Sequence, residues 1–136
     1  MNELSYQIKT HRVNRGYNQP HFFLLNKGLN SGRPMKEPCP NCFTITTKTE
    51  EQRNTLFYLC FSLQIGRYFS IFIKGSVVPF ITIDDTRNVL NKALSNYKED
   101  QWQSKVEKLI MITIYENNLK DQLKTIGQLK IAILRT

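Results

Sequence analysis

The sequence predicts an α+β fold in which a small, mainly antiparallel sheet with two or three helices is followed by a long C-terminal helix. Short apolar, β-branched runs bounded by turn signals occupy the first half of the chain and indicate strands. A helical spacing of apolar residues begins near residue 50. The last part of the chain repeats apolar residues every seven positions without a proline. With 136 residues, we expect one α+β domain over residues 1–95, including an N-terminal arm, and a separate helix over residues 101–136.

The strands are expected early in the chain. Residues 1–20 are polar and contain turn formers, which indicates an arm or a single edge strand. The run HFFLL at residues 21–25 and the alternating run FTITT at residues 43–47 each predict a strand. Residues 26–41 are rich in glycine, proline and asparagine and are expected to form a loop.

A first helix is expected from Thr49 to about Gly66. Its apolar residues Leu56, Leu59 and Leu63 share one face, and two glutamates suit its first turn. A glycine just beyond the last apolar residue is typical of a helix end.

The segment that follows is harder to assign. The run RYFSIFIK at residues 67–74 is compatible with helix or strand. The run FITI at residues 80–83 predicts a strand, and Asp84 with Asp85 predicts the cap of a helix that ends at Leu94. Residues 96–100 would connect it to the last helix.

The C-terminal segment, residues 101–136, predicts a long helix of coiled-coil type. Apolar side chains recur at seven-residue intervals, at Ile112, Leu119, Ile126 and Ile133. Such a stripe is expected to pack on a second helix, which comes from the same chain, from a second copy in a homodimer or from a related subunit.

The charge of the chain is positive and unevenly distributed. The formal net charge is +8, and the first 40 residues hold six basic side chains against two acidic ones. Clustered Lys and Arg favour polyanions, because neutralising phosphates releases condensed counterions. The alternative is that the charge only keeps a small protein in solution.

The segment Cys39-Pro40-Asn41-Cys42 has the spacing of a zinc or redox motif. A structural zinc site needs four ligands, and a second CxxC is absent; only Cys60, His11 and His21 remain. We therefore expect a turn with buried cysteines and no metal or cofactor, with a metal site and a redox pair as the alternatives.

No catalytic constellation is predicted. The acidic pair at residues 84–85 has no further carboxylate nearby to hold magnesium, and His21 has no nucleophile to activate. The loop KGLNSGR at residues 27–33 lacks the Gly-Lys-Ser/Thr ending of a P-loop. These absences favour a protein that is not an enzyme.

One part of the chain carries a family resemblance. The aromatic run LFYLCFSLQI, the second run RYFSIFIK, the segment GSVVPFI and the following Asp-Asp pair resemble the second half of a target-recognition domain from the specificity subunits of type I restriction-modification systems. The matching positions are Gly75, Ser76, Pro79 and Ile81. The chain departs from that family in being shorter, in lacking the usual proline pair and in holding one half of a duplicated arrangement.

The resemblance implies DNA recognition by a half-subunit, with residues 101–136 as an antiparallel coiled-coil spacer. The chain also resembles an uncharacterised group of short bacterial and phage proteins that share its Asn-Ser-Gly, Pro-Cys-Pro-Asn-Cys-Phe and Gly-Ser-Val-x-Pro-Phe-Ile segments.

We therefore expect a non-enzymatic module that binds duplex DNA. Its side chains would contact phosphates and base edges, and the expected residues are Arg12, Arg15, Lys27, Asn30, Ser31, Arg33, Lys36, Arg67 and Lys74. The alternative is a protein-interaction or accessory subunit that acts through the C-terminal helix, with incidental basic charge. The N-terminus has no apolar run of the kind that a secretory signal needs, and no apolar stretch is long enough to span a bilayer, so a cytoplasmic protein without membrane contact is expected.

Overall fold

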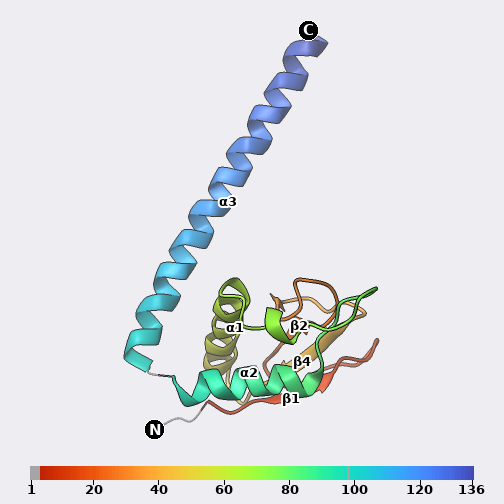
Figure 1. Cartoon of the computed structure of the whole chain (residues 1–136). Helices are drawn as coiled ribbons and strands as arrows, with labels where there is room; N and C mark the ends of the chain where they lie inside the picture. The colour runs from red at the N-terminus through yellow and green to blue at the C-terminus, as the bar shows by residue number, and fades with distance from the viewer. Residues whose placement is uncertain (1–3, 98) are drawn as a thin grey trace. The chain divides into compact units, whose positions relative to one another are not determined.

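The structure, a computed structural model, describes residues 4–97 and 99–136. The chain divides into two compact units, residues 1–97 (unit 1) and residues 98–136 (unit 2). Unit 1 contains a four-stranded antiparallel sheet with helices, and unit 2 contains one long helix (Figure 1). The predicted α+β class is confirmed.

The sheet of unit 1 has the strand order β1-β4-β2-β3, and all neighbouring strands are antiparallel. The strands are β1 (Gln7–Thr10), β2 (His21–Leu25), β3 (Pro34–Met35) and β4 (Cys42–Thr46). Because β1 and β2 both pair antiparallel with β4, they run in the same direction on either side of it. The predicted strands at 21–25 and 43–47 are confirmed, and the N-terminal arm contains the edge strand β1.

The register decides which side chains form the core. One face of the sheet, here called the inner face, carries large apolar side chains on the three longer strands: Ile8, Phe22, Leu24, Phe43 and Ile45. All five are buried. Helix α1 contacts β2 and β3, and α2 contacts β1, so both helices pack on the sheet (Figure 1).

Helix α1 (Glu50–Ile65) begins and ends where the sequence predicts. The Thr49 hydroxyl accepts a hydrogen bond from the Gln52 backbone N–H, and Gly66 is the C-cap. The predicted face of the helix is buried, including Leu56 and Leu63.

The predicted strand at residues 80–83 is wrong. Phe80 forms only isolated bridges, with Lys27 and with Lys74. Helix α2 (Ile83–Ser95) begins earlier than predicted, because the Thr82 hydroxyl accepts from the Asp85 backbone N–H at 3.1 Å. Thr82 is therefore the cap, and the predicted cap residues lie in the first turn, where carboxylates suit the helix dipole.

Two other segments differ from simple expectations. Residues 67–74 are neither a regular helix nor a strand, since they contain a short 3₁₀ helix, η1 (Ser70–Phe72), and a bridge at Lys74. The expected loop at 26–41 contains β3, which adds only two residues to the sheet edge. Pro34 is tolerated there because an edge strand does not need every backbone N–H.

Unit 2 consists of helix α3 (Glu99–Arg135), in agreement with the predicted C-terminal helix. Of the predicted connector at 96–100, Lys98 lies outside the described residues and Glu99 already belongs to α3. Within the described part of the chain, no helix combines the length and apolarity needed to cross a membrane.

Candidate nucleic-acid interface

Basic residues from separate loops meet at one end of the sheet, here called the basic end. Two backbone hydrogen bonds join neighbouring loops, from His11 N–H to Cys42 O (3.0 Å) and from Asn26 N–H to Asn41 O (3.1 Å). A third, from Leu25 N–H to Arg33 O (3.0 Å), closes the loop between β2 and β3. Arg12 directly follows His11 in the sequence, and Lys27 directly follows Asn26. The backbone carbonyl of Arg33 is itself the acceptor of one of these bonds. The three exposed cations therefore share one end of the sheet.

A short hairpin extends the basic end. The backbone groups of Lys74 and Phe80 exchange two hydrogen bonds of 2.8 Å, and Phe80 also bridges to Lys27. Residues that lie opposite each other in such bridges project to the same side. Lys27, Phe80 and Lys74 therefore form a row in which two cations flank a ring that is 39% exposed. Lys74 is partly neutralised by Asp85, whose carboxylate lies 3.3 Å from its Nζ.

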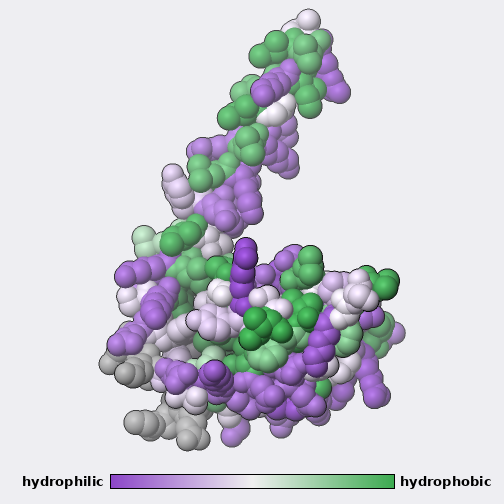
Figure 2. All heavy atoms as spheres, in the orientation of Figure 1, coloured by the Kyte–Doolittle hydropathy of each residue, from purple (hydrophilic) through white to green (hydrophobic). Residues whose placement is uncertain are grey.

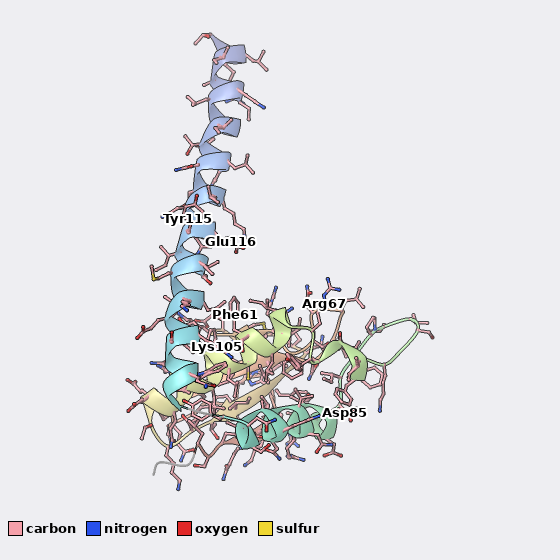
Figure 3. All side chains as sticks on the ribbon, turned by 60° about the vertical axis from the view of Figure 1, so that its left-hand side comes forward. Phe61, Arg67, Asp85, Lys105, Tyr115 and Glu116 are labelled. Carbon is pink, nitrogen blue, oxygen red and sulfur yellow. The ribbon has the colours of Figure 1, made fainter. Side chains whose placement is uncertain are left out.

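The segment after α1 packs against the same loops. Gly32 has a positive φ of 96°, and a methyl group there would overlap the buried ring of Phe69. This close approach holds the 28–33 turn beside the segment that carries Arg67. Arg67 follows the C-cap of α1 with a positive φ of 63°, is exposed, and projects away from the helix end (Figure 3).

Eight of the nine predicted DNA-contacting residues are exposed, and Ser31 is not. Ser31 is only 2% exposed, and its hydroxyl donates to the Gly28 carbonyl at 2.6 Å. Ser31 is therefore not available to contact DNA as expected, and its hydroxyl instead stabilises the turn. Strand β3 runs antiparallel to β2 and therefore leads away from the basic end. Lys36 follows β3, whereas Arg33 precedes it, so the two side chains are separated.

The sequence did not predict a polar and aromatic cluster that lies on the other face of the sheet. The Tyr17 hydroxyl lies 2.8 Å from His11 Nδ1 and 2.7 Å from the buried Thr44 Oγ1, and the Tyr17 ring lies near His21 and Phe23. These contacts fasten the connection between β1 and β2 across the sheet. The only signal in the sequence is the alternation that puts His21 and Phe23 on one side of a strand.

The same cluster also orients Arg15, one of the predicted DNA-contacting residues. The Arg15 guanidinium carbon lies 5.9 Å from the centroid of the Tyr17 ring, within the range of a cation–π contact. Arg12 and Arg15 belong to one turn, because the Arg15 backbone N–H donates to the Arg12 carbonyl at 3.1 Å. The anchored Tyr17 therefore restrains the loop that presents both arginines.

The CxxC segment forms a tight bend. The Cys42 thiol is buried and donates to the Cys39 carbonyl at 3.1 Å, and burial is the main cause that raises its pKa. Burial also raises the pKa of the Cys60 thiol, which lies inside the core. Among the described residues, no three His, Cys, Asp or Glu side chains are grouped so that they could hold a metal ion.

Figure 2 shows hydrophilic and hydrophobic surface interleaved over unit 1. Exposed apolar residues lie on the loops next to the cations, including Leu29, Val77 and Val78. The fold and the site together define a small α+β protein whose loops carry a basic surface.

Residues 8–136 match the family of unknown function DUF6943, and the chain belongs to this family. No curated protein and no solved structure shows a significant match. The family match agrees with the resemblance to an uncharacterised group of short proteins, and it gives no support to the resemblance to restriction specificity subunits.

Proposed function

We propose that unit 1 is a non-enzymatic module that binds duplex DNA through the basic end. The observation that carries the proposal is the convergence of Arg12, Lys27, Arg33, Arg67 and Lys74. They come from the β1–β2, β2–β3 and α1–α2 connections, which are held by backbone hydrogen bonds and by the packing of Gly32 on Phe69.

The electrostatics support the proposal. The net charge of +8 provides a field that attracts a polyanion, and the basic end concentrates exposed guanidinium and ammonium groups. Only Lys74 among these cations has a carboxylate partner within 4 Å in the described residues. Arg12, Lys27, Arg33 and Arg67 can therefore contact phosphates without first breaking an ion pair.

Roles within the surface follow from side-chain chemistry. Lys27 and Lys74 act as point charges toward phosphates, whereas Arg33 and Arg67 offer forked donors that suit phosphates or guanine edges. Asn30 lies exposed in the same turn and can pair with a base edge. Arg15 and Lys36 contribute at the margins of the surface.

The test is the salt dependence of duplex affinity, measured by fluorescence anisotropy with a labelled DNA duplex. Each phosphate contact contributes a slope of about 0.9 in log affinity against log salt. Lys27→Ala and Arg33→Ala should each lower the slope by about that amount. Lys48→Ala is the matched control, because Lys48 is exposed but follows β4 at the opposite end of the sheet. The proposal fails if wild-type protein does not bind duplex DNA at low salt.

A second candidate function is protein interaction through α3. The heptad residues Ile112, Leu119, Ile126 and Ile133 are all exposed on this helix. Pairing with the same helix of a second copy would make a dimer with two basic ends, as a half-subunit arrangement requires. In this reading the protein works in the cytoplasm, and the positive charge is incidental if DNA binding is absent.

A further inference from the structure

Among the described residues, strand β1 pairs with another strand along one edge only. It is the first strand in the order β1-β4-β2-β3, and its partner β4 lies on one side only. The His11 backbone N–H donates to the Cys42 carbonyl, so residues 7, 9 and 11 direct their backbone groups toward β4. Ile8 and Thr10 therefore direct theirs outward, where no strand pairs with β1 in the described part of the chain.

A groove runs along this edge. It has a volume of about 590 Å³ and is lined by residues 4–9 on one wall and by Arg87, Asn91 and Leu94 of α2 on the other. The Tyr6 hydroxyl donates to Asn91 Oδ1 at 2.7 Å, which ties the segment before β1 to the helix. Burial raises the pKa of Tyr6 to about 12.

The groove is basic. Lys9 and Arg87 contribute its charges, and none of the described residues that line it is acidic. Arg87 is paired with Asp84 at 2.9 Å, but the Asp84 side chain is 82% exposed. Such a surface pair is weak, so a second carboxylate can take over or share the guanidinium.

We propose that this groove binds an extended acidic peptide of a partner protein, which adds to the edge of β1 as a further strand. Its backbone pairs with the outward groups of Ile8 and Thr10, and its carboxylates face Lys9 and Arg87. Main-chain hydrogen bonds supply affinity in this mode of binding, and the side chains that meet the groove supply specificity.

The charges argue against a second copy of β1 as the occupant. Strand β1 has the sequence QIKT, and the front of the chain is basic, so self-pairing would bring like charges together. An acidic strand would instead bring negative charges next to the positive charges of the groove, which is favourable. This site is separate from the basic end, so its test does not depend on DNA binding.

The experiment uses the full chain and a displayed library of random linear peptides. Selected peptides should be rich in acidic and β-branched residues, and their binding should slow hydrogen exchange at the Ile8 and Thr10 backbone N–H groups. Thr10→Pro removes one outward N–H and leaves the β4 ladder intact, because an edge strand tolerates proline at such a position. It should weaken a synthetic selected peptide by about tenfold, whereas Thr10→Val should have little effect.

Arg87→Glu is an independent variant that does not alter the strand. It should weaken the same peptide by at least about fivefold, and Arg135→Glu on α3 controls for the change in net charge. The proposal is overturned if no peptide is enriched, or if Thr10→Pro and Arg87→Glu bind the selected peptide as tightly as wild type. Self-association of the chain that Thr10→Pro abolishes would also overturn it, because the occupant would then be a second copy.

Discussion

At the scale of single residues, Gly32 shows how a missing side chain shapes the basic end. Its φ of 96° lies in the left-handed region, and the Phe69 ring occupies the place that a methyl group would need. Two costs therefore combine at this position, one from the backbone and one from the overlap with a buried ring.

We predict that Gly32→Ala lowers the free energy of unfolding by about 3 kcal/mol, measured by urea denaturation. Gly28→Ala is the control, because Gly28 has a φ of 93° but an open space where its Cβ would lie. It should cost only about 1 kcal/mol, from the backbone alone. Equal effects of the two substitutions would show that the Phe69 contact does not constrain the turn.

The cysteines give a second prediction at this scale. If Cys39 and Cys42 only shape a bend, purified protein carries no stoichiometric zinc, and Cys42→Ser leaves the fold intact because a hydroxyl can also donate to the Cys39 carbonyl. Metal analysis and circular dichroism check both points. Bound zinc that is lost together with folding on this substitution would contradict the turn and favour a metal site.

At the scale of elements, the helix starts follow local chemistry. Thr49 and Thr82 each accept a backbone N–H three residues ahead, and both have extended backbone angles at the cap. The start of α1 was predictable because the acidic first turn and the apolar period agree. The start of α2 was misplaced because an Asp pair and a Thr are both good caps, and only the hydrogen-bond geometry distinguishes them.

We predict that Thr82→Ala destabilises unit 1 by about 1 kcal/mol in urea denaturation, since one backbone N–H of the first turn loses its acceptor. Thr82→Ser keeps the hydroxyl and should stay close to wild type. Asp84→Ala is informative in the same experiment, because Asp84 would be the costly position if it, and not Thr82, capped the helix.

At the scale of the whole molecule, helix α3 exposes a repeating row of apolar side chains. Leu119 and Ile126 are 47% and 50% exposed, and with Ile112 and Ile133 they follow a seven-residue repeat. On a straight helix, positions seven residues apart shift gradually around the helix axis. Two helices that wrap around each other in a left-handed supercoil keep these positions in contact along their length. Met111, Ile114 and Ile131 lie on other faces of α3 and are exposed as well.

We predict that the protein is a dimer through α3, measured by light scattering. Leu119→Asp with Ile126→Asp should give a monomer or an insoluble chain, because two charges would lie in the apolar seam. Asn117→Asp with Gln128→Asp adds the same charge on the opposite side of the helix and should leave the dimer intact. A wild-type monomer at high micromolar concentration would refute the pairing of α3.

The sequence by itself determined the local elements. Apolar period, caps and turn formers act over a few residues, so strands β2 and β4, helix α1 and the long helix α3 could be predicted from composition and spacing. The identity of most exposed basic residues on loops was also accessible, since Lys and Arg in segments rich in glycine and proline remain in contact with water.

Only the tertiary structure decided how these elements meet. The row of Lys27, Phe80 and Lys74 joins positions that are distant in sequence through backbone pairing, and the burial of Ser31 follows from a turn closed by its own hydroxyl. The open edge of β1 and the groove beside α2 depend on strand order, which no local pattern specifies. Register and strand order arise from packing between segments far apart in the chain, and that is why the proposed surfaces became visible only in the folded protein.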